Sequence, residues 1–356
     1  MAGAAGAAPA AVEVVLAAVR ARGLLPADGQ SGVVTMLSGG RDSVCLLDVA
    51  LSVCGAGRVR ALHVNYGLRA EAGGDERHCR ELCEGLGVQL RVLHAQLPQG
   101  AGNVQAWARD VRYDAAREFA AELDGSVDAA AARCAPPATP SPPVTPSHPS
   151  TLVAVGHTAT DQVETILYRL AASPGRRALL GMLASDGRVV RPLLGVTREQ
   201  TAAYCTARGL VWREDASNDS DAYARGRVRA QLVPALRAVH PAAQANVLRT
   251  AQLLREETEL LDGLVDAELA GEDSIATARL AQLAPALARM VVVRLAEQAA
   301  GDFVPQAGDR VAEILALAAK GGRSELHVGN LIAATIADGR LRMVRIAPHH
   351  PGPGED

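Results

Sequence analysis

A short glycine-containing turn, residues 38–43, lies between a strand-like apolar run and a helical pattern, and it constrains the fold more than any other segment. The run Gly32–Leu37 before it is typical of a buried strand, and the helical pattern after it continues to about Val53. Strand, tight turn and helix predict one unit of an α/β sheet, in which N–H groups at the helix N-terminus can bind an anion. The turn consists of Ser38, Gly39, Gly40, Arg41, Asp42 and Ser43.

The residue types in this turn suit a polyphosphate. The hydroxyl groups of Ser38 and Ser43 can donate to phosphate oxygens, and the carboxylate of Asp42 can hold Mg²⁺ between two phosphates. An ordinary strand-to-helix turn is the alternative, because Ser, Gly and Asp are common in turns and helix caps. A Walker A loop and a dinucleotide-binding turn are excluded, since the lysine of the first and the glycine spacing of the second are missing.

Composition allows a globular chain of more than one domain. The 356 residues suffice for two cores, and 49% apolar with 21% charged residues is ordinary for such a protein. With 3% aromatic residues and a net charge of −3, nothing global indicates a nucleic-acid-binding protein, so RNA binding needs a local basic patch. Lys320 is the single lysine, and cations in a site are therefore arginines, which suit bidentate phosphate contacts.

The sequence predicts neither a signal peptide nor a membrane-spanning segment. The N-terminal stretch through Ala11 has no basic residue, and no apolar run approaches the ~18 residues of a membrane span. The cysteines form no C-x-x-C pair and are expected to be small buried residues of a cytoplasmic protein. The six are Cys45, Cys54, Cys79, Cys83, Cys134 and Cys205.

Strand-like and helical patterns alternate over the first two thirds of the chain. Strands are predicted at Gly32–Leu37, Val59–Val64, Val88–His94 and Thr151–Gly156, and helices at Val12–Arg22, Glu76–Leu86, Asn103–Leu123 and Thr160–Ala172. This alternation predicts an α/β fold with a doubly wound, mostly parallel sheet, covered by helices on both faces. In such sheets ligands bind at the carboxyl ends of the strands.

Two further segments define the expected domains. A stretch at about 125–150, dense in Pro, Ala, Thr and Ser after Cys134, is expected to be a disordered insertion at the sheet edge opposite the ligand. After it, the pattern changes to long helices and then to strands around an Asp338-Gly339 turn. We therefore expect a nucleotide-binding domain at 1–236 and a smaller helical α+β domain at 237–348.

Two acidic residues follow the fourth predicted strand. Asp161 and Glu164 lie three residues apart and share one helical face. They could belong to a helix-capping arrangement, or they could bind a cationic co-substrate or Mg²⁺ beside the nucleotide turn. The residue types alone favour neither interpretation.

Five other segments carry polar residues where strands end or helices begin, and each has an ordinary interpretation as a turn or a solvated helix face. They are His63–Arg69, Asn103–Tyr113, Arg191–Leu194, Trp212–Asn218 and Arg225–Arg229.

Taken in this order with the Ser-Gly-Gly-Arg-Asp-Ser turn, these segments resemble the tRNA(Ile)-lysidine synthetases, N-type ATP pyrophosphatases of the PP-loop superfamily. The resemblance runs from about Val33 to Pro234 and implies an adenine nucleotide alpha hydrolase-like fold. It implies a ligase that forms a C–N bond: ATP adenylates the C2 carbonyl oxygen of the wobble cytidine in the CAU anticodon of the isoleucine tRNA. The ε-amine of lysine then displaces AMP to give lysidine.

The resemblance also implies roles for individual residues. The turn would bind the pyrophosphate of ATP, Asp42 would hold Mg²⁺ and act in catalysis, and Asp161 and Glu164 would bind free L-lysine. Either Arg225 or Arg229 would stabilise the adenylate or contact tRNA(Ile). The second domain would bind tRNA, and the family suggests a homodimer.

The chain departs from the family at three positions. Tyr66 stands where the family usually has His, Gly226 where it has Asn, and Thr158 replaces the second residue of a frequent His-His pair. A tyrosine does not titrate near neutral pH, so Tyr66 is not expected to be catalytic.

Other functions fit the turn less well. A tRNA thiolase of the 2-thiocytidine type shares the adenylation step, but its sulphur chemistry needs a C-x-x-C pair or an iron–sulphur ligand set. An amidotransferase needs an ammonia source, and no glutaminase nucleophile is evident. A non-catalytic nucleotide-binding protein is disfavoured because Ser38, Asp42, Asp161 and Glu164 are all present.

Overall fold

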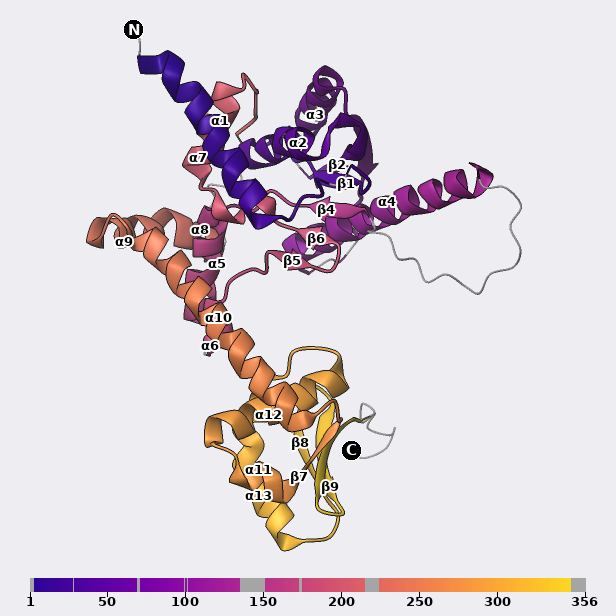
Figure 1. Cartoon of the computed structure of the whole chain (residues 1–356), viewed down its shortest axis with the longest axis vertical. Helices are drawn as coiled ribbons and strands as arrows, with labels where there is room; N and C mark the ends of the chain where they lie inside the picture. The colour runs from indigo at the N-terminus through magenta and orange to yellow at the C-terminus, as the bar shows by residue number, and fades with distance from the viewer. Residues whose placement is uncertain are drawn as a thin grey trace. The chain divides into compact units, whose positions relative to one another are not determined.

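The structure is a computed structural model that describes residues 3–27, 29–68, 71–98, 100, 102–134, 151–172, 175–214 and 224–346. The chain divides into two compact units, Met1–Ala251 and Gln252–Asp356 (Figure 1). Within the described ranges, none of the helices has the length and apolar character needed to cross a bilayer.

A six-stranded sheet forms the centre of the first unit, with the strand order β3-β2-β1-β4-β6-β5. Neighbouring strands from β3 to β6 run parallel, and only β5 is antiparallel to its neighbour. The strands are β1 (Val33–Met36), β2 (Val59–Asn65), β3 (Gln89–His94), β4 (Leu152–Ala154), β5 (Ser185–Asp186) and β6 (Val189–Val190). The sheet confirms the predicted doubly wound α/β fold.

Alternating residues of the strands face two different cores. Val33 of β1 belongs to a core that contains residues of helices α1, α2, α3 and α7, whereas Val34 packs with α4 on the other face. The helices of this unit are α1 (Gly3–Arg22), α2 (Arg41–Cys54), α3 (Ala72–Leu86), α4 (Val104–Cys134), α5 (Ala159–Ala172), α6 (Arg176–Leu179), α7 (Arg198–Ala207), α8 (Ala224–Arg227) and α9 (Val233–Val239). Short helical turns add η1 (Ala56–Arg58), η2 (Pro192–Gly195) and η4 (Val228–Leu232).

The helix α4 differs from its predicted length. It continues through Cys134, so residues 125–134, expected to begin the disordered insertion, are helical in the structure. This stretch is rich in alanine, the residue with the highest helix propensity, which explains the extension. Residues 135–150 lie outside the described residues.

The second unit contains a four-stranded antiparallel sheet of order β7-β10-β9-β8 and its helices. The predicted turn at Asp338-Gly339 joins β9 to β10. The elements are α10 (Ala243–Leu269), which begins in the first unit, β7 (Ser274–Ala276), α11 (Thr277–Gln282), α12 (Pro285–Ala300), η5 (Pro305–Arg310), α13 (Val311–Lys320), β8 (Ser324–Gly329), β9 (Ile332–Ala337) and β10 (Arg340–Arg345).

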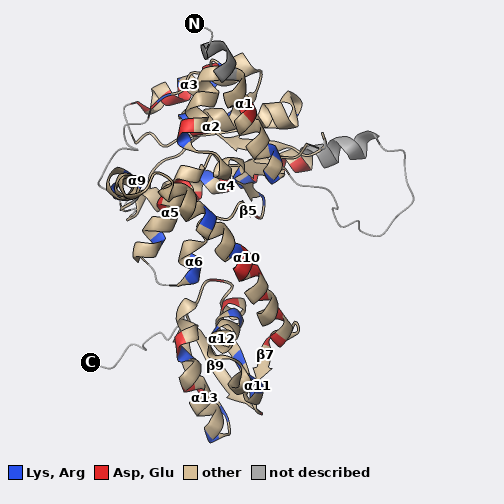
Figure 2. Cartoon of the chain, turned by 60° about the vertical axis from the view of Figure 1, so that its left-hand side comes forward, with Lys and Arg blue, Asp and Glu red and all other residues tan. Residues whose placement is uncertain are grey.

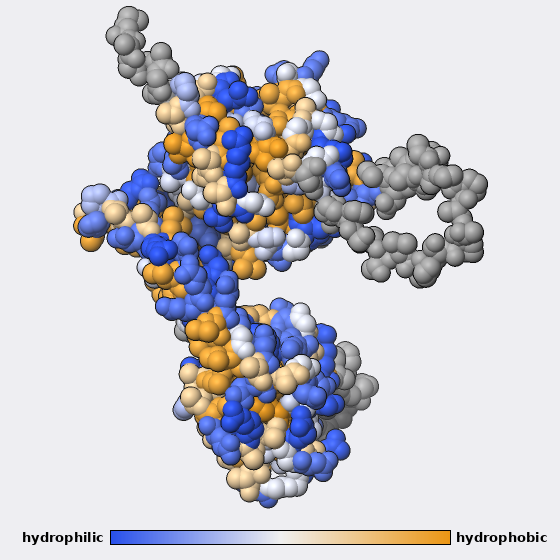
Figure 3. Space-filling model, viewed as in Figure 1, coloured by the Kyte–Doolittle hydropathy of each residue, from blue (hydrophilic) through white to orange (hydrophobic). Residues whose placement is uncertain are grey.

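The surface of α10 is both acidic and partly apolar. Acidic residues outnumber basic ones along this helix, as its sequence and Figure 2 show. Figure 3 shows apolar and polar patches intermixed on the visible surface, and the leucines Leu253, Leu260 and Leu264 of α10 are exposed. The helix therefore offers no continuous basic face for RNA.

A buried carboxylate fixes α7 against α2. Asp48 is 2% exposed, and its Oδ2 accepts hydrogen bonds from the Tyr204 hydroxyl at 2.6 Å and from Arg208 Nε at 2.9 Å. Replacing Asp48 by Asn puts an amide among the donors of Tyr204 and Arg208, so we expect the free energy of unfolding to fall by about 2 kcal/mol, the scale of a buried hydrogen-bonding group left mismatched. Urea denaturation measures this loss.

The matched control is Asp114→Asn. Asp114 forms an ion pair with Arg117 at 3.2 Å in which both side chains are largely exposed. An exposed pair contributes little, so this variant should unfold close to the wild-type midpoint. Equal midpoints for the two variants would show that Asp48 does not hold α7.

Candidate active site

The predicted phosphate turn is closed by its own two serines. Ser43 Oγ donates to the carbonyl oxygen of Gly40 at 2.8 Å and lies 3.0 Å from Ser38 Oγ, which accepts from the Gly40 N–H at 3.3 Å. The helix α2 begins directly after Gly40 and has no side-chain cap on its first N–H groups. Those N–H groups are the donors that the predicted anion site would use.

Gly39 occupies a position that only glycine fits. Its φ is +85°, and a Cβ atom there would lie 3.3 Å from Cys79 Sγ. The Arg213 N–H donates to the Gly39 carbonyl at 3.0 Å, and the Arg213 guanidinium pairs with Asp75 at 2.7 Å. The turn is thus held from outside by Arg213, a residue for which the sequence alone indicated no role of its own.

The loop after β4 packs directly on the first turn of α2. A Cβ atom at Gly156 would lie 3.1 Å from the Asp42 carbonyl oxygen and 3.2 Å from the Ser43 nitrogen. This close approach, which requires glycine, brings the start of α5 beside the phosphate turn. The two motifs predicted at the carboxyl ends of β1 and β4 therefore meet.

Asp161 takes part in a helix cap and also in an ion pair. Its Oδ2 accepts from the Thr158 N–H and hydroxyl, both at 2.8 Å, whereas its Oδ1 accepts from Arg198 Nη2 at 2.7 Å. Burial acts to raise the pKa of Asp161, but Arg198 and the Thr158 donors outweigh it, and the pKa is lowered. The Asp161 carboxylate is therefore ionised at neutral pH, and its hydrogen bonds to Thr158 and Arg198 fix its orientation.

Glu164 is buried and paired with arginine. It is 3% exposed, and its two oxygens accept from Arg229 Nε at 2.7 Å and Nη2 at 3.0 Å in a bidentate arrangement. The Arg198 Nη1 atom lies 3.5 Å from the same carboxylate. Arg229, one of the two arginines predicted to stabilise the adenylate or contact tRNA(Ile), thus pairs with an acid that was predicted to bind lysine.

Arg198 joins the acids to the phosphate turn, although no sequence motif had singled it out. Besides Asp161 and Glu164, its Nε atom lies 3.4 Å from Asp42 Oδ2. Arg198 is the first residue of α7, where Thr197 and Gln200 form a reciprocal capping box. That Thr-x-x-Gln pattern is the sequence signal that locates the helix start and its arginine.

The surroundings of Asp42 stabilise a negative charge less well than those of Asp161. Burial raises its pKa, the Thr201 hydroxyl at 2.5 Å from Oδ1 opposes the rise, and the negative charge of Asp161 adds to it. A divalent cation between phosphates would relieve this repulsion, so the residues fit the predicted Mg²⁺. Among the described residues no group of three or more His, Cys, Asp or Glu has metal-ligand geometry.

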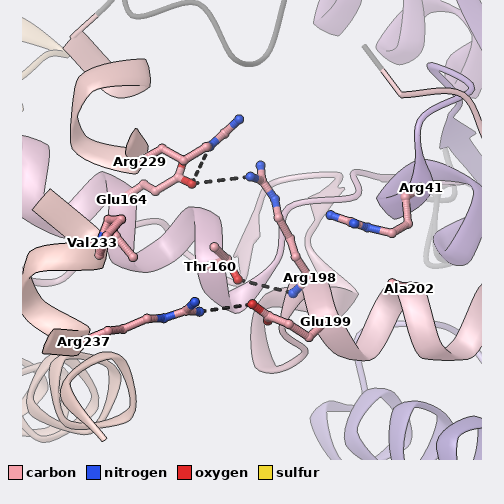
Figure 4. A pocket seen from close by; sticks show the side chains of 10 residues that line it. Arg41, Thr160, Glu164, Arg198, Glu199, Ala202, Arg229, Val233 and Arg237 are labelled. Atoms are coloured by element: carbon pink, nitrogen blue, oxygen red, sulfur yellow. Dashed lines mark hydrogen bonds and ion pairs between the residues drawn. The ribbon is translucent and has the colours of Figure 1, made fainter. Parts of the chain in front are cut away.

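A cavity of about 510 Å³ opens beside these groups (Figure 4). Figure 4 shows Glu164 between Arg229 and Arg198, and the pair of Arg237 with Glu199 across the cavity at 3.1 Å. Its walls are Arg41, Thr160, Glu164, Arg198, Glu199, Ala202, Arg229, Val233, Pro234 and Arg237. The mixture of arginines and buried acid suits a ligand with both charges, or two ligands of opposite charge.

The motif after β2 has a structural role. The Tyr66 hydroxyl donates to the Ala108 carbonyl at 2.8 Å, its ring meets Trp107 edge-on at 5.7 Å, and burial raises its pKa. His63 Nδ1 lies 2.9 Å from the Leu37 carbonyl oxygen. These contacts hold the end of β2 against α4 and the residue that follows β1. Arg69 lies outside the described residues.

Arginines gather around His157 on the α4 side. Burial lowers the pKa of His157 to about 4, opposed by Asp161 and assisted by Arg191, Arg112 and Arg109. The ring is therefore neutral at physiological pH, and it does not act as a cation there.

The last predicted segment is only partly described. Arg225 lies in α8, but its side chain lies outside the described part of the chain. Residues 215–218 of the preceding predicted segment lie outside it as well. Gly226 is within α8, and Arg227 is exposed. Of the two candidate arginines, Arg229 is the one with a described position in the site.

Comparison with known proteins identifies the family of this chain. The chain matches the PP-loop domain family over residues 15–132 and 144–236, which include the phosphate turn, both acids and Arg229.

Curated relatives share the name tRNA(Ile)-lysidine synthase. The protein from Pseudomonas putida is 34% identical over 275 residues, covering 71% of this chain and 57% of the relative. That from Pseudomonas aeruginosa is 36% identical over 258 residues, covering 70% and 51%. That from Solibacter usitatus is 34% identical over 312 residues, covering 84% and 64%. The chain thus spans between about half and two thirds of the length of these relatives.

A solved structure confirms the fold. The U34-tRNA thiolase NcsA from Methanococcus maripaludis, described with its [4Fe-4S] cluster, superposes with a TM-score of 0.53 at 15% identity. The match covers 70% of this chain and 80% of the thiolase.

Proposed function

Because the chain belongs to the PP-loop domain family, we propose that it uses ATP to ligate the ε-amine of free L-lysine to C2 of the wobble cytidine of tRNA(Ile). The products are lysidine, AMP and pyrophosphate, and the cytidine is adenylated before the amine attacks. The observation that carries this proposal is that the phosphate turn, Asp161 and Glu164 lie around one connected site with Arg198 between them. The names of the curated relatives support the substrate.

The phosphate turn would hold the β- and γ-phosphates. The N–H groups at the start of α2 would bind phosphate oxygens, and the Ser38 and Ser43 hydroxyls can exchange their mutual hydrogen bond for the same ligand. Asp42 would hold Mg²⁺, which when bound neutralises charge on the leaving pyrophosphate. Arg41, with 26% of its side chain exposed at the cavity wall, would contact the phosphates from the solvent side.

The acid pair would bind the lysine side chain. Asp161 has a lowered pKa, and a carboxylate that stays ionised binds an ammonium group well but accepts its proton poorly. Asp161 and Glu164 therefore orient and hold the amine, and the arginines that line the cavity would contact the α-carboxylate of the amino acid or the adenylate. Arg229 contributes by fixing Glu164.

The tRNA would contact both units. We assign the nucleotide-binding role to residues 1–236 and tRNA binding to the accessory region 237–348, and a homodimer is compatible with this assignment. The acidic surface of α10 means that its contribution must come from individual arginines rather than from a continuous basic face.

A thiolase is the alternative, and the cysteines oppose it. Burial raises the pKa of Cys79 to about 12 and of Cys83 to about 11, so both thiols are unreactive at neutral pH. Cys45, Cys54 and Cys205 are also buried, and the described residues contain no cluster that could hold iron. The likeness to NcsA extends to the fold alone.

The deciding experiment incubates the protein with tRNA(Ile) transcript, ATP, Mg²⁺ and radiolabelled lysine. We expect label in the tRNA in proportion to AMP released, and none when the wobble cytidine is replaced by uridine. Absence of label with the correct transcript would overturn the ligase proposal. Incorporation of sulphur from a labelled donor would replace it with the thiolase.

A further inference from the structure

Arg198 occupies the place that a cationic substrate would take. Its guanidinium lies 2.7 Å from Asp161 Oδ1, 3.5 Å from Glu164 Oε1 and 3.4 Å from Asp42 Oδ2. Only the first distance is that of a strong charge-assisted hydrogen bond, and the Nε atom, although buried, has no hydrogen-bond partner. The single guanidinium of Arg198 thus lies near three carboxylates but forms a short hydrogen bond only with Asp161.

Each carboxylate also has a second partner that does not depend on Arg198. Thr158 holds Asp161 through two donors at 2.8 Å, Arg229 holds Glu164 in a bidentate pair, and the Thr201 hydroxyl holds Asp42. The three acids would therefore keep their orientation if the guanidinium moved away. Its departure would open one oxygen on Asp161 and one on Asp42.

The position of Arg198 allows such a movement. Its side chain is 21% exposed and lines the 510 Å³ cavity, into which a long flexible side chain can swing. Its backbone is fixed because the residue begins α7, whose capping box and buried Tyr204 anchor the helix. Only the side chain needs to change, which costs little compared with a loop movement.

We propose that Arg198 is an internal counter-ion that holds the acid site in the substrate-free protein and is displaced by the ammonium group of lysine. This rests on the proposed function, because lysine is the cation concerned. Displacement makes lysine binding weaker than the acids alone would allow, and it frees Asp42 in the same movement. Arg198 is then a positioning residue that couples the amino-acid site to the phosphate turn.

The test is calorimetric titration of L-lysine into the full chain without nucleotide. If Arg198 competes with lysine, Arg198→Gln should bind lysine roughly tenfold more tightly than the wild type, the scale of one close charge pair. Arg198→Lys restores a cation and should return the affinity to the wild-type value. Norleucine, which lacks the ε-ammonium group, should bind no better to Arg198→Gln than to the wild type.

The matched control is Arg279→Gln. It removes the same charge from an exposed pair with Glu268 in the second unit, and lysine affinity should not change. A purely structural Arg198 predicts the opposite sign, so unchanged or weaker lysine binding by a folded Arg198→Gln variant overturns the proposal. If the wild-type protein transfers lysine to tRNA but Arg198→Gln does not bind lysine more tightly, only the counter-ion role of Arg198 is refuted. Absence of both transfer and lysine binding would refute the proposed function as well.

Discussion

Replacing Asp42 by Asn should reduce AMP formation by a factor of about 10³ or more, the scale of losing a charge-stabilising group at the leaving phosphate. Asn keeps the shape and can still accept from Thr201, but it cannot neutralise a cation. The measurement is pyrophosphate release with tRNA, lysine and a range of Mg²⁺ concentrations. Retention of a tenth of the wild-type rate would mean that another group holds the metal.

The same substitution should not destabilise the fold. The pKa of Asp42 is raised in the folded state, so folding favours its protonated form. When the folded-state pKa of an acid is raised, its ionised form opposes folding. The loss of stability begins as the pH rises above the ordinary pKa of the acid and is complete once the pH has passed the folded-state pKa. The Asp42→Asn variant avoids the penalty, and at pH 7 it should unfold at a urea concentration equal to or higher than that of the wild type.

Thr201→Val provides the matched comparison. It removes the hydroxyl that donates to Asp42 but leaves the carboxylate in place. Loss of one orienting hydrogen bond should reduce AMP formation by roughly tenfold, far less than loss of the charge. Equal losses in Asp42→Asn and Thr201→Val would indicate that orientation rather than charge is what Asp42 supplies.

The sequence predicted the parallel sheet because its main strands are apolar runs bounded by glycine or polar turns. The hairpin of β5 and β6 was missed, since each strand has two residues and no period can appear in so short a segment. The change of pattern predicted a domain boundary after residue 236, whereas the second compact unit begins at Gln252. The end of α4 was misplaced because alanine-rich and proline-rich residues adjoin there without a polar boundary.

Site features formed by residues close together in the sequence could be predicted, whereas contacts between residues far apart in the sequence could not. The turn at 38–43 carries its own signature, and Asp161 is marked by Thr158 three residues before it. The pairing of Glu164 with Arg229 joins residues 65 positions apart, and the contact of Asp42 with Thr201 joins residues 159 apart. No periodicity reports such pairs, so the arginine network became visible only in the structure.

Replacing Glu164 by Gln should raise the KM for lysine by roughly 100-fold, because the amine loses one of two charged acceptors in a buried setting. The free energy of unfolding should fall by about 3 kcal/mol, since the Arg229 guanidinium is left without its bidentate partner. The two effects have different causes, and a second substitution separates them. Urea denaturation gives the stability, and lysine transfer to tRNA gives the KM.

The double variant Glu164→Gln, Arg229→Gln removes both members of the pair. The stability loss should then be smaller than the sum of the single losses, because no charge is left uncompensated. The high KM for lysine should persist, since the acceptor is still missing. A double variant with wild-type KM would mean that Glu164 serves only to hold Arg229. Persistence of the high KM makes Glu164 a lysine ligand whose pairing with Arg229 holds the buried side chain in place.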